Sequence, residues 1–184
     1  MNEKTKEVLK NIIELVLVAV VTYVVFTYVV KPIRIEGTSM MNTVSDQDMA
    51  LMDAIGVTQN GVERFDVVIV DCDSLNETLI KRVIGLPGET IEYKNDKLYV
   101  NGVYVKEEYF DKEYIEASKK TYNSLLFTHD FSVTLGQDEY FVLGDNRLNS
   151  KDSRVLGAFH LDDFLGKNGF VIYPFEHFGW INHG

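Results

Sequence analysis

This chain of 184 residues is poor in cysteine and in positive charge. Its single cysteine, Cys72, cannot form an internal disulfide, and its place in the apolar run 65–72 predicts a small buried hydrophobe rather than a catalytic thiol. Lys and Arg number 18 against 28 Asp and Glu, which gives a formal net charge of -10. Nucleic-acid binding relies on a basic patch, so this balance argues against nucleic acid as a partner.

The chain also lacks several sequence motifs of known catalytic sites. A Gly-x-Ser-x-Gly nucleophile elbow is excluded at Ser39, because Met41 occupies the place of the second glycine. The Ser-x-x-Lys arrangement fails at the same serine, because Asn42 stands where the lysine belongs. The histidines have no metal-ligand spacing and are interpreted as surface or packing residues: His129, His160, His177 and His183.

No internal repeat and no low-complexity linker divides the chain, which predicts one globular domain with an appendage. The appendage is the apolar run 12–30, whose helix would span roughly 28 Å, the thickness of a bilayer core. A cleaved signal peptide has a shorter apolar region that ends in small residues, whereas this run continues with Val, Phe and Tyr. The run is therefore predicted to be an uncleaved transmembrane anchor. A buried core helix is the weaker alternative, because the apolar residues lack helical periodicity.

The charges around this run slightly favour a cytoplasmic N-terminus. Three lysines precede the run and Lys31 and Arg34 follow it, so the positive-inside rule gives only a small bias. We expect residues 1–11 to be a short cytoplasmic tail, residues 12–30 to be the anchor, and residues 31–184 to be an extracytoplasmic domain.

Beyond the anchor, the sequence is typical of an antiparallel β protein. Pro32 is predicted to end the helix, and the alternating residues 31–36 predict an extended segment, so Ser39 would lie in or just after a strand. Residues 106–123 are charged and rich in Tyr, and they predict either an irregular excursion or a short helix. Short Val, Ile and Tyr runs separated by Gly, Pro, Asn and Asp predict strands and hairpins at residues 49–53, 65–72, 78–86, 90–94, 98–100, 131–135, 140–143 and 169–173.

Ser39 lies in the stretch Gly37–Thr43 and needs a base to become a nucleophile. Lys81 is the candidate, because it stands in the apolar β run Leu79–Gly85 and shares its strand face with apolar residues. Removal of an ammonium from water lowers the pKa of a lysine, which makes a neutral amine available as a general base. A surface lysine on a half-exposed strand is the alternative that this strand alone would favour.

A third polar block, residues 144–154, follows an apolar strand directly. It contains two possible Asp–Arg arrangements that would hold the loop rigid: Asp145 with Arg147 or Arg154, and Asp152 with Arg154. Either Ser150 or Ser153 could orient a catalytic amine. A long turn closed by side-chain hydrogen bonds to its own backbone is the simpler interpretation of any single residue here.

Together the three blocks resemble the bacterial type I signal peptidases, membrane-bound Ser-Lys endopeptidases that remove signal peptides from exported preproteins. The order of the blocks and the preceding anchor cover nearly the whole chain. The matching residues are Ser39-Met40-Met41 with Thr43, Ile80 to Glu89, Gly144-Asp145-Asn146-Arg147, Asn149-Ser150 and Asp152-Ser153-Arg154.

The resemblance implies a role for each matching residue. Ser39 would be the nucleophile and Lys81 the general base, with Ser150 hydrogen-bonding the amine and the Ser39 backbone amide in the oxyanion hole. It implies no metal and no organic cofactor. The residues with supporting roles would be Arg82, Asp145, Arg147, Asp152 and Arg154. The resemblance also implies an apolar substrate cleft that accepts small residues at the first and third positions before the cut. The residues lining it would be Pro32, Ile35, Met40, Val44, Leu79 and Ile80.

The implied fold is mainly β: an antiparallel domain with partly open barrel character, a reduced second subdomain at roughly residues 95–140, and one N-terminal transmembrane helix. The implied partners are preprotein signal peptides, the phospholipid membrane and the secretion translocon, with the chain in the bacterial plasma membrane. Two residues depart from the family pattern. Asn42 stands where proline is usual, and Gly37 has no side chain to supply the second oxyanion donor that some members have.

Two other classes remain open. One is a catalytically weak or inactive factor on the same fold that assists surface-protein assembly. Such relatives are expected to lose the serine or the lysine, and this chain retains both. The other is the class of self-cleaving Ser-Lys repressors, which would be soluble and carry a DNA-binding module instead of a membrane anchor.

Overall fold

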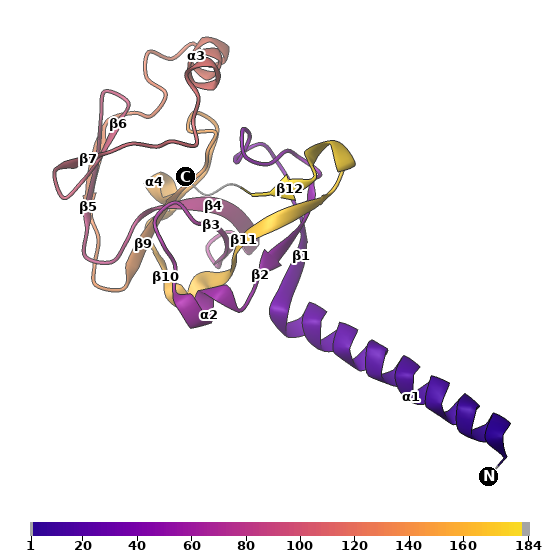
Figure 1. The fold of residues 1–184 in the computed structure, drawn as a ribbon. Coiled ribbons are helices and arrows are strands. Elements are labelled where there is room, and N and C mark those ends of the chain that lie inside the picture. Colours follow the sequence, from indigo (N-terminus) through magenta and orange to yellow (C-terminus); the bar gives the residue numbers. More distant parts are fainter. Residues whose placement is uncertain (1, 182–184) are drawn as a thin grey trace.

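A computed structural model describes residues 2–181, and in it a long N-terminal helix projects away from the β-sheet part of the molecule (Figure 1). Helix α1 spans Glu3–Val24 and continues as π-helical turns, η1, over Val25–Val29. The 27 residues from Glu3 to Val29 are long and apolar enough to cross a membrane, and none of the residues in their apolar window is buried. The helix begins well before residue 12, because the polar residues 3–11 are also helical.

The sequence predicted that Pro32 ends the helix, and this prediction is wrong. The helix ends at Val29, and Pro32 lies inside strand β1, Val30–Arg34. A proline disfavours helical geometry in the residue before it, so its influence reaches Lys31 and the chain is already extended at Val30, whose φ is -126°. Strand β1 lies at the edge of its sheet, where the missing N–H of a proline is tolerated.

The larger sheet has eight antiparallel strands in the order β1-β2-β11-β3-β4-β9-β10, with β12 also paired to β11. Strands β3 and β4 are therefore interior, and their residues from Val67 to Val70 and from Ile80 to Gly85 are buried. The other strands of this sheet are β2 (Met49–Asp53), β3 (Val67–Cys72), β4 (Glu77–Gly85), β9 (Glu139–Leu143), β10 (Phe159–His160), β11 (Phe164–Tyr173) and β12 (Gly179–Trp180).

The smaller sheet has four antiparallel strands in the order β7-β6-β5-β8. Its two tight hairpins turn at Asn95-Asp96 and Asn101-Gly102, all with positive φ, as the turn residues in the sequence predicted. The sheet overlaps the region for which a reduced second subdomain is predicted, and the independence of that subdomain stays a prediction. Its strands are β5 (Thr90–Lys94), β6 (Lys97–Val100), β7 (Val103–Val105) and β8 (Phe131–Thr134).

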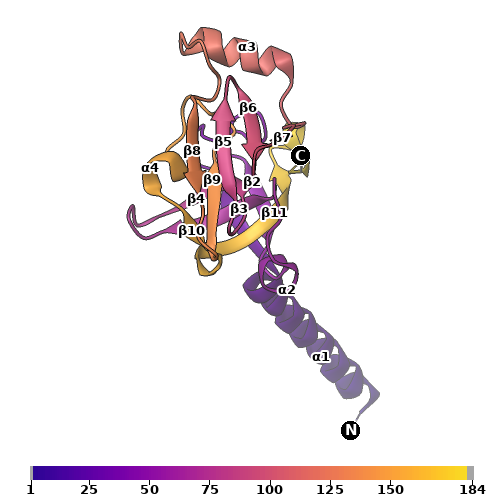
Figure 2. The same cartoon turned by 90° about the vertical axis from the view of Figure 1, so that its left-hand side faces the viewer.

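Short helices fill the connections between the strands. For residues 106–123 the structure has the helical alternative, α3 at Lys112–Thr121, capped by Asp111, whose carboxylate accepts a hydrogen bond from the Tyr114 N–H at 2.6 Å. This helix lies across one end of the smaller sheet (Figure 2). The remaining helical elements are α2 (Gly56–Asn60), α4 (Ser153–Leu156), η2 (Leu161–Asp163) and η3 (Phe175–His177).

The mainly antiparallel β fold is confirmed, whereas the strands of residues 2–181 form no closed barrel. Strand β4 ties the molecule together, because its residues enter three separate apolar clusters: Ile80 in the first, Val83 in the second and Ile84 in the third. Strand β4 is therefore held by apolar packing on both faces of the sheet. Such a strand can position a functional group accurately.

Candidate active site

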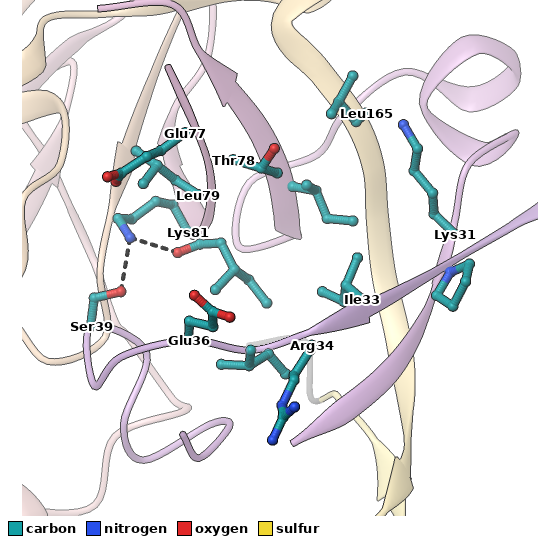
Figure 3. Close-up of a pocket in the computed structure, with 14 residues that line it drawn as sticks. Lys31, Ile33, Arg34, Glu36, Ser39, Glu77, Thr78, Leu79, Lys81 and Leu165 are labelled. Carbon is teal, nitrogen blue, oxygen red and sulfur yellow. Dashed lines mark hydrogen bonds between the residues drawn. The ribbon is translucent and has the colours of Figure 1, made fainter. Parts of the chain in front are cut away.

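The structure brings Ser39 and Lys81 into direct contact. Ser39 lies in a turn after β1, and Lys81 lies in the middle of β4, opposite Val68 of β3. The Lys81 Nζ hydrogen-bonds Ser39 Oγ at 2.9 Å and donates to the Ile80 carbonyl oxygen at 2.8 Å (Figure 3). Lys81 is only 2% exposed, so the alternative of a surface lysine on a half-exposed strand is wrong.

Burial changes the acid–base behaviour of this lysine. Desolvation lowers the pKa of the Lys81 amine to about 8, although the carboxylates of Asp152 and Asp145 partly oppose the effect. Among residues 2–181, no carboxylate lies within ion-pair distance of the amine. A substantial fraction of the amine is therefore neutral near pH 8 and can accept a proton.

The neighbouring Arg82, unlike Lys81, has a buried carboxylate as its ion-pair partner. Its Nε and Nη2 donate to Asp145 at 2.9 and 2.7 Å, and its Nη1 donates to the Phe65 carbonyl oxygen at 2.9 Å. Thr43 joins the pair, because its hydroxyl donates to Asp145 and accepts from Arg82 at 3.0 Å. The Arg82–Asp145 pair therefore ties the loop that carries Ser39 to the strand that carries Lys81.

The sequence assigned the wrong partners to Asp145. It pairs with Arg82 of β4 and not with Arg147 or Arg154, the arginines nearest to it in sequence. Arg147 instead pairs with Glu107, which sequence analysis did not select. The two Asp145 options were chosen on sequence distance alone, whereas the fold places β4 and β9 side by side, with Arg82 opposite Leu143.

The second predicted pair is present. Arg154 donates to both oxygens of Asp152, each at 2.8 Å, and Asp152 also accepts from the Gly144 N–H at 3.0 Å. Burial opposes ionisation of Asp152, but these bonds prevail and lower the pKa of its carboxyl. The carboxylate therefore stays charged and holds the two ends of the 144–154 loop together.

The two candidate serines of this loop have different surroundings. Ser153 Oγ accepts a hydrogen bond from the Val142 N–H at 3.0 Å, which is a structural role. Ser150 Oγ is buried and close enough to the Asp152 carboxyl to help lower its pKa, but among the described residues it makes no hydrogen bond to Lys81. The role of Ser150 in orienting the lysine amine therefore stays a prediction.

The 144–154 loop also packs directly on the backbone beside the nucleophile. The Asn146 N–H donates to the Ser39 carbonyl oxygen at 2.9 Å, and Asn146 Nδ2 donates to the Thr38 carbonyl oxygen at 3.2 Å. At Gly144, a Cβ would lie 2.5 Å from the Ser39 carbonyl oxygen, so only glycine allows the two segments to approach this closely. Three segments far apart in sequence thus meet at Ser39.

A cavity of about 620 Å³ opens beside the Ser39–Lys81 contact (Figure 3). Of the six residues predicted to line the substrate cleft, Pro32, Ile35, Leu79 and Ile80 line it. The sequence pattern did not indicate the rest of the lining: Ile69 and Leu165 come from neighbouring strands, and the others lie within two residues of a predicted one. These further residues are Lys31, Ile33, Arg34, Glu36, Ile69, Glu77, Thr78 and Leu165.

Met40 and Val44, the other two predicted cleft residues, do not line this cavity. They are 1% and 4% exposed and belong to the first apolar cluster, with Ile35 and Ile80. The Met40 side chain lies beneath the loop, where its Sδ accepts from the Asp145 N–H at 3.4 Å. In this structure the two residues support the cleft from below.

The predicted departures at Gly37 and Asn42 coincide with backbone of positive φ, 87° and 98°. The Gly37 N–H donates to Asp46 at 2.8 Å, and Thr38 Oγ1 accepts from Asn149 at 3.2 Å. The Ser39 N–H makes no hydrogen bond to a described residue and is therefore available to a ligand.

None of the described histidines lines the cavity beside Ser39 and Lys81, and neither does Cys72. His177 contacts Asp48 at 2.7 Å and His160 contacts Asp138 at 3.3 Å, while His183 lies outside the described residues. Cys72 is buried. Within residues 2–181, no cluster of three or more His, Cys, Asp or Glu side chains could hold a metal ion.

Comparison with known proteins gives consistent results. Residues 7–173 match the family model described as signal peptidase, peptidase S26. Signal peptidase I U of Bacillus subtilis is 38% identical over 175 residues, which cover 94% of this chain and 92% of that protein. Signal peptidase IB of Staphylococcus aureus is 36% identical over 180 residues, with 94% and 93% covered.

A solved structure shares part of the fold. The crystal structure of a signal peptidase I from Enterococcus faecalis superimposes with a TM-score of 0.50 at 35% identity, covering 58% of this chain and 95% of that one. The chain therefore belongs to the signal peptidase family, peptidase S26: it is a membrane-anchored serine endopeptidase that removes signal peptides.

Proposed function

We propose that the chain cleaves signal peptides from exported preproteins by a Ser39–Lys81 dyad. The observation that carries the proposal is the 2.9 Å contact between a half-buried serine hydroxyl and a buried lysine amine whose pKa is lowered to about 8. This contact lies within the distance over which a general base takes a proton.

In the proposed reaction, the neutral Lys81 amine takes the hydroxyl proton of Ser39 as Ser39 Oγ attacks the scissile carbonyl carbon. The resulting ammonium gives this proton to the departing amine when the peptide bond breaks, and the signal peptide remains as an ester on Ser39. Water then attacks the ester, Lys81 takes its proton, and the proton returns to Ser39 Oγ as the acid leaves.

The developing oxyanion needs hydrogen-bond donors. The Ser39 N–H fits this role, because no protein group of the described chain uses it. Gly37 cannot contribute a side-chain donor. The Thr38 hydroxyl accepts from Asn149, so its own hydrogen can serve as a second donor.

Substrate choice follows from the cavity beside the dyad. Ile35, Leu79 and Ile80 give it apolar walls close to Ser39, which suits an extended apolar peptide with small residues at the first and third positions before the cut. No cofactor takes part in this chemistry. Lys81 and Ser39 supply both the proton acceptor and the nucleophile.

The proposed topology has residues 1–11 in the cytoplasm, residues 12–30 in the plasma membrane and residues 31–184 outside. Ser39 follows Val30 by nine residues, at most about 30 Å of extended chain, so substrate meets the site near the membrane surface. Exposed aromatic residues from the end of β11 through η3 to β12, Tyr173, Phe175, Phe178 and Trp180, offer the phospholipid surface an apolar contact. Signal peptides would arrive there from the secretion translocon.

The test is cleavage of a purified preprotein by the full chain in phospholipid vesicles. We expect mature protein that begins directly after a small residue, and no product from Ser39→Ala. Binding of the preprotein without turnover by the unaltered chain would contradict the dyad and favour the inactive assembly factor instead.

A further inference from the structure

Residues 106–123, here called the bridge segment, join β7 to β8 in the chain and hydrogen-bond the loop that carries Ser39. The segment leaves β7, forms α3 and returns toward β8 (Figure 2). None of its residues lines the cavity beside Ser39. Its contacts reach residues 38–44, here called the nucleophile loop, from the side away from Lys81.

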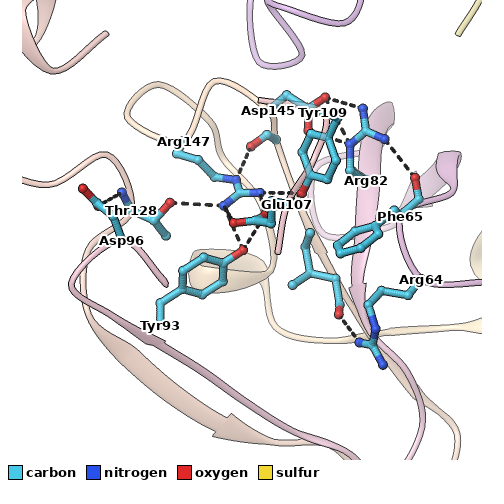
Figure 4. A network of polar contacts seen from close by, with 12 residues as sticks. Arg64, Phe65, Arg82, Tyr93, Asp96, Glu107, Tyr109, Thr128, Asp145 and Arg147 are labelled. Atoms are coloured by element: carbon cyan, nitrogen blue, oxygen red, sulfur yellow. Dashed lines mark hydrogen bonds and ion pairs between the residues drawn. The ribbon is translucent and has the colours of Figure 1, made fainter. Parts of the chain in front are cut away.

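The bridge segment is anchored by polar contacts that are largely buried. Glu107 accepts hydrogen bonds from Arg147, from Tyr93 at 2.7 Å and from Tyr109 at 2.6 Å (Figure 4). The Tyr109 ring also faces the Arg82 guanidinium, with 3.9 Å from Cζ to the ring centroid. Two of the three supporting arginines, Arg82 and Arg147, therefore contact the first residues of the bridge segment.

From this anchor, two hydrogen bonds hold the nucleophile loop. Asn42 Nδ2 donates to the Tyr109 carbonyl oxygen at 3.1 Å, and the Tyr114 hydroxyl donates to the Met41 carbonyl oxygen at 2.8 Å. The Tyr114 ring is itself oriented by Phe110, stacked at 6.0 Å, and by Phe127, edge-on at 5.8 Å. Burial raises the pKa of Tyr114, so its hydroxyl keeps its proton and remains a donor.

The backbone of Asn42 explains why the loop needs these bonds. Its φ of 98° lies in the region that glycine and asparagine tolerate and that a proline ring, fixed near -65°, cannot reach. The rigidity that proline gives at this position in the related pattern is therefore absent here. Hydrogen bonds from outside the loop are the available substitute.

We propose that Asn42 and Tyr114 are positioning residues through which the bridge segment holds Ser39 in contact with Lys81. This proposal rests on the proposed function. Neither side chain contacts the dyad, and each acts through the backbone of the residues that follow Ser39. Loss of either bond lets the nucleophile loop move, which reduces the fraction of molecules with Ser39 in reach of the amine.

The first test compares Tyr114→Phe with the matched control Tyr104→Phe, using the full chain in phospholipid vesicles and a preprotein substrate. Tyr104 lies in β7, is 53% exposed, and its hydroxyl makes no hydrogen bond to a described residue. We expect kcat to fall about threefold to tenfold in Tyr114→Phe, the value of one hydrogen bond, with KM and the unfolding temperature unchanged. A kcat equal to that of Tyr104→Phe would overturn the proposal.

Two substitutions at Asn42 separate its side chain from its backbone. Asn42→Gly keeps the positive φ and removes the donor, so we expect the same threefold to tenfold fall in kcat. Asn42→Pro must change φ as well, and we expect a larger fall. An Asn42→Gly variant as active as the unaltered chain would overturn the positioning role of the Asn42 side chain.

An independent measurement does not depend on turnover. The Thr43 and Val44 N–H groups donate to the Met40 carbonyl oxygen at 3.0 and 3.1 Å. We expect their hydrogen exchange to be faster in Tyr114→Phe and unchanged in Tyr104→Phe. Faster exchange supports the positioning role even if the unaltered chain cleaves nothing, in which case only the proposed function fails. Unchanged exchange overturns the positioning role.

Discussion

Lys81 and Arg82 are neighbours in β4, are both almost fully buried, and are held in opposite ways. Among residues 2–181, the Lys81 amine hydrogen-bonds a hydroxyl and a carbonyl oxygen, and its pKa is lowered to about 8. The Arg82 guanidinium hydrogen-bonds the buried carboxylate of Asp145 through both Nε and Nη2. Because successive residues of a strand point to opposite faces, one strand presents a reactive amine on one side and a fixed cation on the other.

The difference between the two residues separates reactivity from stability. A buried cation without a carboxylate partner destabilises the fold. Such a lysine is typical of a functional site at which the neutral amine takes part in a reaction. A buried cation with a partner contributes to a fixed arrangement, and removal of one member leaves an uncompensated charge. Substitutions at residues 81 and 82 should therefore affect different properties.

The largest expected effect is the loss of activity when Lys81 is replaced. We expect Lys81→Ala to reduce kcat for preprotein cleavage by roughly a thousandfold or more, with the fold retained, because the variant has no proton acceptor. Lys81→Arg should be equally inactive, since a guanidinium stays protonated. An active arginine variant would contradict the role of the neutral amine. Turnover in vesicles and circular dichroism provide the measurements.

Replacement of Arg82 should damage stability first. In Arg82→Met the Asp145 carboxylate is left buried without its cation, and we expect the free energy of unfolding to fall by about 3–5 kcal/mol. Denaturant unfolding of the full chain in detergent measures this. The double variant Arg82→Met with Asp145→Leu should recover part of the loss. If the single variant were as stable as the unaltered chain, the Arg82–Asp145 pair would not stabilise the fold, and this expectation would be wrong.

The pH dependence of cleavage follows from the lowered pKa of Lys81. Only the neutral amine accepts a proton, so kcat/KM should fall about tenfold per pH unit below a pKa of about 8 and level off above it. Between pH 8 and pH 6 this amounts to roughly fiftyfold, because half of the amine is already protonated at pH 8. Rates measured across this range with one preprotein test the expectation, and a flat profile would contradict it.

A smaller effect, of opposite sign, is expected for the stability of Lys81→Met. The folded pKa of about 8 lies below the unfolded value of 10.5, so the lysine lowers stability progressively as pH falls from 10.5 to 8 and by a constant amount below 8. At pH 7 we expect the methionine variant to be more stable by about 1–3 kcal/mol and inactive. Equal stability of variant and unaltered chain at pH 7 and pH 10 would show that burial of the amine costs nothing.

Much of the fold could be predicted from residue patterns. The strands at 49–53 and 90–94 have the predicted bounds, and Pro87-Gly88 and Asn95-Asp96 mark the ends of the second. Strand β11 begins at Phe164 and not at residue 169, since Gly166, Lys167 and Asn168 break its apolar pattern at a bulge. The helix end was also misplaced, because the effect of Pro32 on the residues before it was not considered.

Site residues could be predicted where a charged residue stands in an apolar stretch of sequence. They could not be predicted where their partners come from distant segments of the chain. Lys81 is conspicuous as a charge within an apolar strand. Asp145 had two arginines close by in sequence, and only the pairing of β4 with β9 selects Arg82. Glu107 lies in a charged stretch without periodicity, so nothing local distinguishes it from Glu108, which is exposed.

The most direct test of the account is the pKa of the Lys81 amine itself. In the full chain with isotopically labelled lysine, NMR titration should show one amine that titrates near pH 8 and is absent from Lys81→Met. This result would establish a buried amine that is neutral when catalysis requires it. A Lys81 amine that titrates near 10.5 would contradict the account.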